Sequence, residues 1–190
     1  MGREETKTAE IPLLRLSKLL SLMLRHEPAR FSLVLDAEGF VPLQDVLLAA
    51  RTRIAEVSEA DIIAVVATIE PEKRRFSIVD TDIRANYGHS LAGRILHAEA
   101  TPPSLLYHGT HESAAPVILD GGLAPMQRQY VHLTVDRQLA TRVGARRGRP
   151  VILEIPALDA HRDGVKFYRA NQSFWLADAV PAKYLRRSQA

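Results

Sequence analysis

The stretch that decides the fold is Leu16-Ser17-Lys18-Leu19-Leu20-Ser21-Leu22-Met23-Leu24-Arg25-His26-Glu27-Pro28. Its leucines and methionine recur at the offsets of a helix with one apolar face. Pro28 disfavours helical geometry at the residue before it, so the helix is predicted to end near His26. Arg25 and His26 then lie side by side at its tip, where a permanent cation beside a proton-exchanging group suits a phosphate. The alternative is that this basic pair only complements the negative end of the helix dipole.

The composition is that of an ordinary globular protein. The chain has 190 residues, 46% of them apolar, which is enough for one domain or two small ones. It has 25 Lys and Arg against 22 Asp and Glu, and this net charge of +3 does not by itself imply nucleic acid. Cysteine is absent, which excludes disulfides and cysteine-zinc sites and fits a reducing compartment. The longest apolar run, near 62–69, is too short to cross a bilayer. We therefore expect a soluble, cytoplasmic protein that does not act in a membrane.

Three helices followed by a hairpin are predicted in the first half of the chain. After the quoted helix, extended pieces at 31–35 and 39–41 flank a turn, and Pro42 opens a second helix. Ser58-Glu59-Ala60-Asp61 has the pattern of a capping box before a third helix, which Pro71 closes. Strands at 75–79 and 83–85 follow. This order is the layout of a winged helix, a fold that commonly handles nucleic acid but does not settle function.

The second half is predicted to be rich in strands. A segment without clear period at 91–104 ends in Thr101-Pro102-Pro103-Ser104 and indicates a domain boundary. Strands are expected at 105–108, 130–134, 151–155, 165–168 and 174–176. A helix at about 113–120 stops at Gly121-Gly122, and Asp136 caps a second helix that runs to about residue 146.

Two of these strands carry a histidine near their end. His108 precedes Gly109-Thr110, and His132 precedes Leu133-Thr134. Alternation alone places a lone strand histidine on a polar face, but two such strands, each followed by a hydroxyl residue, favour a binding site. A glycine after His108 lets a ligand approach the backbone closely.

Several separated pieces of the chain together carry a resemblance to a known family. They lie at 16–28, 73–76, 83–90, 106–110, 126–134, 143–148 and 167–168, with Asn171, Trp175 and Leu176. In their order and spacing they resemble the RNA 2′-phosphotransferase family, which removes a 2′-phosphate from the splice junction of transfer RNA with NAD. The resemblance covers most of the chain.

The resemblance implies an α+β architecture with two lobes. Residues 1–95 are expected to form a winged-helix lobe that binds RNA, and residues 96–190 an ADP-ribosyltransferase-like lobe that binds NAD. The family's catalytic set falls on Arg25, His26, Arg75 and Arg128, and its NAD-contacting motifs on Tyr107, His108, Gly109, Thr110, His132 and Thr134. NAD is expected as a co-substrate, RNA carrying a 2′-phosphate as the partner, no metal, and a monomer.

The implied reaction has two steps. The RNA 2′-phosphate attacks the nicotinamide ribose and expels nicotinamide, and a neighbouring ribose hydroxyl then attacks that phosphorus. The products are RNA with a 2′-OH and a cyclic phosphate of ADP-ribose. Fixed arginines suit the charge on the phosphoryl oxygens, and His26 is expected to move the protons.

This chain departs from the family pattern in two places. One segment is a residue longer than the family pattern, namely Asn171-Gln172-Ser173-Phe174-Trp175-Leu176. The resemblance therefore does not identify which of its residues closes the nicotinamide pocket. Arg147 stands where a histidine is common.

Two alternatives remain open at this stage. One is an ADP-ribosyltransferase that modifies a protein, a nucleic-acid end or a small molecule. The other is a winged-helix binding module whose second lobe only senses a nucleotide. Neither explains an arginine-histidine pair at a helix tip as directly as phosphate transfer does.

Overall fold

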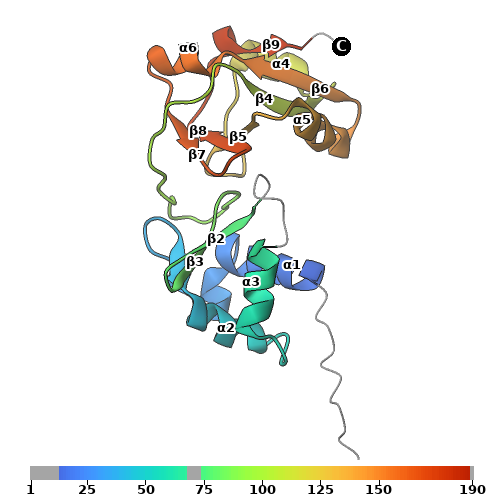
Figure 1. Cartoon of the computed structure of the whole chain (residues 1–190). Helices are drawn as coiled ribbons and strands as arrows, with labels where there is room; N and C mark the ends of the chain where they lie inside the picture. The colour runs from blue at the N-terminus through green and yellow to red at the C-terminus, as the bar shows by residue number, and fades with distance from the viewer. Residues whose placement is uncertain (1–12, 68–73, 189–190) are drawn as a thin grey trace, which may run out of the picture.

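The computed structural model describes residues 13–67 and 74–188. Its N-terminal half contains α1 (Leu13–Arg25), the 3-10 helix η1 (Pro28–Phe31), β1 (Phe40–Pro42), α2 (Leu43–Arg51), α3 (Glu59–Ala67), β2 (Phe76–Val79) and β3 (Asp82–Ala85). The strands form an antiparallel sheet in the order β1-β3-β2, against which the three helices pack (Figure 1).

The helices of this half follow from local signals in the sequence. The apolar face of α1 buries Leu16, Leu20, Met23 and Leu24 in a core shared with α2, α3 and the sheet. The capping box before α3 is confirmed, because Ser58 Oγ accepts from the Asp61 backbone N–H at 3.2 Å and Asp61 Oδ2 accepts from that of Ser58 at 2.9 Å. The predicted stop at Pro71, and Lys73 of the family pattern, lie outside the described residues.

The extended piece predicted at 31–35 is wrong. Pro28 instead opens the 3-10 helix η1, and Ser32 ends it in the left-handed region at a φ of 57°. Leu33 then donates its backbone N–H to the carbonyl of Pro28 at 3.1 Å. Proline at the start of a short helix costs no hydrogen bond, which is why this segment coils back along α1. The turn after it is as expected, with Asp36 Oδ1 accepting from the backbone N–H of Phe40 at 2.8 Å.

The C-terminal half is built on a six-stranded sheet. Its elements are β4 (Leu106–His111), α4 (Ala115–Gly121), β5 (Val131–Thr134), α5 (Arg137–Gly144), η3 (Ala145–Arg147), β6 (Pro150–Ile155), α6 (Ala157–Arg162), β7 (Phe167–Arg169), β8 (Phe174–Ala177), η4 (Ala182–Tyr184) and β9 (Arg186–Arg187). The strand order is β7-β8-β5-β4-β6-β9. The whole chain is therefore α+β, as predicted, whereas α6 and β9 are elements that the sequence did not predict.

Helix α5 lies unusually close to strand β4. A Cβ atom on Gly109 of β4 would lie 1.8 Å from the carbonyl oxygen of Ala140, and one on Gly144 of α5 would lie 2.4 Å from that of Thr110. Both glycines are needed because backbone faces backbone here. Asp136 caps α5 as predicted, with Oδ1 accepting from the backbone N–H groups of Gln138 and Leu139 at 2.8 and 3.0 Å.

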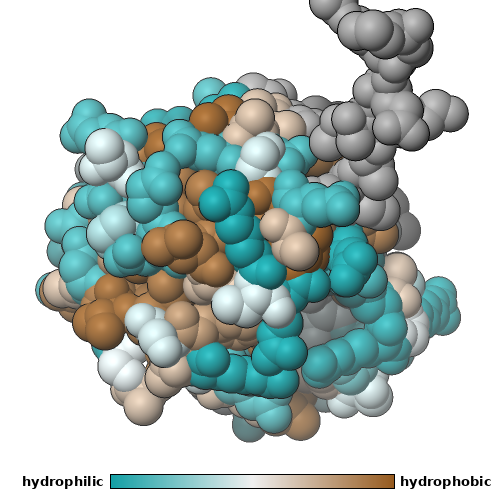
Figure 2. All heavy atoms as spheres, turned by 90° about the horizontal axis from the view of Figure 1, so that it is seen from below, coloured by the Kyte–Doolittle hydropathy of each residue, from teal (hydrophilic) through white to brown (hydrophobic). Residues whose placement is uncertain are grey.

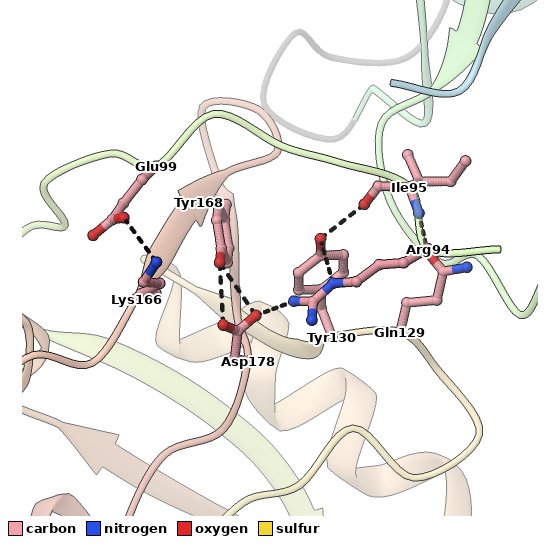
Figure 3. Close-up of polar contacts among 8 residues, drawn as sticks. All are labelled: Arg94, Ile95, Glu99, Gln129, Tyr130, Lys166, Tyr168 and Asp178. Atoms are coloured by element: carbon pink, nitrogen blue, oxygen red, sulfur yellow. Dashed lines mark hydrogen bonds and ion pairs between the residues drawn. The ribbon is translucent and has the colours of Figure 1, made fainter. Parts of the chain in front are cut away.

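The segment between the halves is tied to both of them. Leu96 donates its backbone N–H to Ala37 at 2.7 Å, and Ala100 donates to Phe167 at 2.9 Å. Figure 3 shows Arg94 reaching both the Tyr130 hydroxyl, at 3.0 Å, and the Asp178 carboxylate. Each half has its own buried core. The division into domains at residues 95 and 96 stays a prediction.

No described helix is suited to spanning a membrane. Within residues 13–67 and 74–188, none combines the length and the apolar character needed to cross a bilayer.

The contact between α5 and β4 makes a stability prediction. Gly109→Ala forces a methyl group into the α5 backbone, which cannot rotate away, so we expect a loss of at least about 2 kcal/mol of unfolding free energy. Urea and thermal unfolding measure this, the latter as a drop in Tm of roughly 4 to 8 °C. Gly121→Ala is the matched control, because nothing lies within 4 Å of the added atom. Equal stability of the two variants would contradict the packing described here.

Candidate active site

Arg25 lies at the C-terminal end of α1, where its guanidinium is mostly removed from water. The group is 5.0 Å from the centre of the Tyr87 ring and 5.3 Å from that of Phe76. Its Nη2 donates to the carbonyl oxygen of Arg75 at 3.1 Å, and its Nε has no hydrogen-bond partner among the described residues. Burial lowers the pKa of Arg25 to about 10, and repulsion from Arg75 and Arg128 acts in the same direction. Arg25 therefore remains charged at neutral pH and lies near two further cations.

His26 follows directly and is held by Ser90. Its Nδ1 lies 2.8 Å from Ser90 Oγ, and the Ser90 backbone N–H donates to the Arg25 carbonyl at 3.0 Å. These two bonds orient the ring and leave Nε2 for another partner. Burial lowers the pKa of His26 from its ordinary value, and the positive charges of Arg128 and Arg25 lower it further.

The start of β2 is anchored through its backbone. The carbonyl of Arg75 accepts from Arg25 Nη2 and from the backbone N–H of Asn86, the latter at 2.9 Å. The neighbouring carbonyl of Arg74 accepts from Asn86 Nδ2 at 3.1 Å and from Asn171 Nδ2 at 2.9 Å. Asn171 comes from the C-terminal half, so both halves hold the backbone that carries the exposed Arg75 side chain.

Arg128 reaches the same place from a loop of the C-terminal half. Its Nη1 donates to the carbonyl of Gly88. A Cβ atom on Gly88 would lie 3.5 Å from Arg25 Nη1 and 3.7 Å from Arg128 Nη1, so the two guanidinium groups flank one point. The φ of Gly88 is +90°, a region that favours glycine. Next to Arg128, Gln129 Oε1 accepts from the backbone N–H of Ile95 at 2.9 Å (Figure 3). Gln129 Nε2 donates to the carbonyls of Leu91 and Gly93, and these bonds fix the loop.

The structure thus brings all four predicted catalytic residues to the junction between the halves. Among the described residues, no ion pair joins Arg25, Arg75 or Arg128 to a carboxylate. The described part of the chain also holds no cluster of three or more His, Asp or Glu side chains suited to a metal ion. A concentration of positive charge without acidic partners can bind an anion that carries several oxygens.

Tyr87 is the residue that sequence reasoning missed. Its ring lies against Arg25 on one side and against Phe174 of β8, at 4.7 Å between ring centres, and it meets the His132 ring edge-on at 6.0 Å. Tyr87 therefore joins the guanidinium of one half to the strands of the other. Its place two residues after β3 and directly before Gly88 was the available signal.

The six residues predicted to contact NAD fall on both faces of the C-terminal sheet. Strand alternation and the pairing of Tyr107 with Thr134 place Tyr107, Gly109, His132 and Thr134 on one face. His108 and Thr110 point to the opposite face, where Thr110 is buried. Burial lowers the pKa of His132 to about 4, helped by the nearby charges of Arg128 and Arg25, so this ring is neutral.

Strands β4 and β5 pair at a single position, whereas β5 and β8 pair at four. Beyond Tyr107 and Thr134 the strands diverge, and the His108 ring bridges them, with Nδ1 donating to the carbonyl of His132 at 3.0 Å. The Nδ1–H tautomer leaves Nε2 as an acceptor. Burial lowers the pKa of His108, which keeps the ring neutral.

The predicted reason for Gly109 needs correction. The space that its missing side chain leaves is occupied by the backbone of α5, not by an open approach for a ligand. The Thr134 hydroxyl is also engaged, since it accepts from the Asp136 backbone N–H at 3.1 Å at the start of α5.

The segment that is one residue longer than the family pattern forms a compact turn between β7 and β8. Asn171 Oδ1 accepts from the backbone N–H groups of Ser173 and Phe174 at 2.9 and 2.7 Å. This turn presents Phe174 to Tyr87, while Trp175 points into the core. Phe174 is therefore the aromatic residue of the segment that faces the junction between the halves.

The charges around His26 make a titration prediction. Because Arg128 repels the protonated ring, Arg128→Ala should raise the pKa of His26 relative to the unmodified protein. Added inorganic phosphate should raise it in the unmodified protein, since an anion favours the imidazolium. NMR titration of the His26 ring measures both shifts. A His26 pKa that responds to neither change would place the ring outside the cationic cluster.

Comparison with known proteins assigns the chain to a family. Residues 12–179 match the family model described as RNA 2′-phosphotransferase, Tpt1 / KptA family. A protein from Acetivibrio thermocellus is 42% identical over 175 residues, which cover 90% of this chain and 95% of that protein. One from Streptomyces coelicolor is 45% identical over 172 residues, covering 90% and 93%. One from Rhodopirellula baltica is 42% identical over 180 residues, covering 93% and 97%. Each of the three is named a probable RNA 2′-phosphotransferase. The chain therefore belongs to the RNA 2′-phosphotransferase family and is an enzyme of the transferase class.

Proposed function

We propose that this protein removes an internal 2′-phosphate from RNA in two steps, with NAD as co-substrate. The observation that carries the proposal is that Arg25 and Arg128 flank Gly88, with no ion pair from either to a carboxylate among the described residues, and that the charges of both act on His26. A transfer-RNA-like molecule is the proposed substrate. The proposal includes a winged-helix N-terminal lobe (1–95), an ADP-ribosyltransferase-like C-terminal lobe (96–190), a monomer and a cytoplasmic location.

In the first step, the RNA 2′-phosphate attacks the ribosyl carbon and nicotinamide leaves. What NAD supplies is this carbon with a good leaving group. The phosphate is already an anion, so the protein needs to position it rather than to remove a proton. Guanidinium groups from three separate segments suit that task, because each can donate two parallel hydrogen bonds to phosphate oxygens.

The second step frees the RNA. A ribose hydroxyl attacks the phosphorus, the bond to the RNA 2′-oxygen breaks, and one proton must pass from the entering to the leaving oxygen. His26 is suited to carry it, since its lowered pKa makes the ring neutral and able to accept the proton before giving it up. Arg25, Arg75 and Arg128 stabilise the charge that builds on the phosphoryl oxygens.

We place the nicotinamide end of NAD at the strand pair β4–β5. The divergence beyond Tyr107 and Thr134 lies next to Tyr87 and Phe174, which offer flat apolar surfaces to an aromatic ring. His108, whose ring bridges the two strands from the opposite face of the sheet, offers Nε2 as a neutral acceptor for a hydroxyl or amide. These groups fit a nicotinamide riboside, and we assign them to its binding.

Separating the two steps tests the mechanism. His26→Ala should still release nicotinamide, because the first step needs no base, and RNA should accumulate as an ADP-ribosylated 2′-phosphate. Arg128→Ala should slow both steps together, by about 100-fold or more. Mass spectrometry of the RNA and nicotinamide release measure the outcomes, and His161→Ala is the control.

Two results would contradict this division. Loss of nicotinamide release in His26→Ala, with RNA and NAD binding intact, would move His26 into the first step. A stable ADP-ribosylated product from the unmodified protein, with no cyclic phosphate formed, would support the alternative of an ADP-ribosyltransferase that acts on nucleic-acid ends, proteins or small molecules.

The role of His108 has its own test. His108→Asn keeps a side-chain amide in the place of Nδ1–H for the His132 carbonyl but removes Nε2. We expect KM for NAD to rise about tenfold or more while Tm and RNA affinity stay unchanged. His108→Ala removes both bonds and should also lower Tm. Unchanged KM in His108→Asn would limit His108 to bridging the strands.

A further inference from the structure

A groove of about 330 Å³ lies on the N-terminal half, between α1, η1 and the turn that follows α2. Its apolar lining is Leu19, Leu22, Phe31 and Ile54, and its charged lining is Arg15, Arg30 and Arg53. Figure 2 views the molecule from the side of this half, where apolar side chains show between hydrophilic ones. Its volume is at the lower end for small-ligand sites, so it fits a splayed-out nucleotide rather than a duplex.

The residues of α1 that line the groove share one face of the helix with His26 of the candidate active site. Arg15, Leu19, Leu22 and His26 are spaced by four, three and four residues and therefore share a face of the helix. Arg15 stands about 16 Å from His26 along the helix axis. A strand whose phosphate lies at His26 can follow this face to Arg15 within a few nucleotides.

The lining has the chemistry that single-stranded nucleic acid requires. Its charged members are arginines alone, and its apolar members include one aromatic ring. The guanidinium of Arg53 lies 5.8 Å from the centre of the Phe31 ring, while Arg30 is paired with Glu27 at 2.7 Å. Arg15 and Arg53 have no ion pair among the described residues. Bases stack on aromatic side chains, and free guanidinium groups bind the phosphates between them.

We propose that this groove binds the single-stranded RNA that flanks the 2′-phosphate, with Arg15 and Arg53 on its backbone and a base on Phe31. The proposal rests on the function proposed above and adds a second region of RNA binding to it. Substrate recognition then extends beyond the reacting phosphate, so RNA length on that side raises affinity.

Two RNAs of different length test this groove. We use a 2′-phosphorylated dinucleotide, which cannot reach Arg15, and a single-stranded hexanucleotide with a central 2′-phosphate. The affinity of the Arg15→Ala/Arg53→Ala double variant for the hexanucleotide should be lower than that of the unmodified protein by about tenfold or more. Its kcat/KM for the hexanucleotide should fall by a similar factor. The log–log dependence of affinity on salt should become shallower by about 0.7 for each RNA phosphate that the variant no longer neutralises. The double variant should treat the dinucleotide as the unmodified protein does.

Two further variants sharpen the result. Phe31→Leu keeps an apolar side chain against the core but removes the ring, and should weaken binding of the hexanucleotide by about tenfold. Arg162→Ala, on α6, removes an exposed arginine far from the groove in sequence and should change the binding of neither RNA. Unchanged hexanucleotide affinity in the double variant would overturn the proposal. It would favour a protein segment as the occupant of the groove. Equal losses of affinity for both RNAs would also overturn it.

RNA binding measured by fluorescence anisotropy without NAD distinguishes a failure of the groove proposal from a failure of the proposed reaction. If the unmodified protein converts neither RNA, the proposed reaction fails, whereas the binding difference between the two RNAs still reports on the groove.

Discussion

The site depends on a guanidinium that is held away from water with no carboxylate, among the described residues, paired to it. A buried charge is costly unless it is compensated. For Arg25 the compensation comes from the faces of Phe76 and Tyr87 and from a peptide carbonyl. Aromatic faces and carbonyls stabilise a cation without neutralising it. The positive charge therefore remains available to an anion that binds there, and its neighbours Arg75 and Arg128 add to it.

The two halves meet at this site through backbone carbonyls. Those of Arg74, Arg75 and Gly88 accept hydrogen bonds from side chains, and Asn171 and Arg128 bring two of these donors from the C-terminal half. A peptide carbonyl does not titrate and cannot rotate away from its strand or turn. The relative position of the cationic groups is thus set by the backbone and by the packing of the halves, which is what preorganised stabilisation of a charged transition state requires.

Local features of the fold were predictable because their causes lie within a few residues. The cap at Asp136, the capping box at Ser58 and the turn at Asp36 each satisfy backbone groups two to four residues away. The same reasoning overlooked that Pro28 can begin a short 3-10 helix as well as end a long one. It also missed α6, which spans only Ala157–Arg162 and carries little helical periodicity of its own.

The sequence by itself determined that Arg25 and His26 share the tip of an amphipathic helix, and the resemblance to a family named their distant companions. Only the tertiary structure decided that Arg25, separated from Arg75 by 50 residues, touches its carbonyl and that Arg128 reaches Gly88 across 40. It also placed Tyr87 between the two halves. It showed that the backbone of α5 packs against Gly109. The physical reason is that residue patterns encode helix faces and caps over a few residues. Contacts between remote segments depend on how two separately packed cores come together.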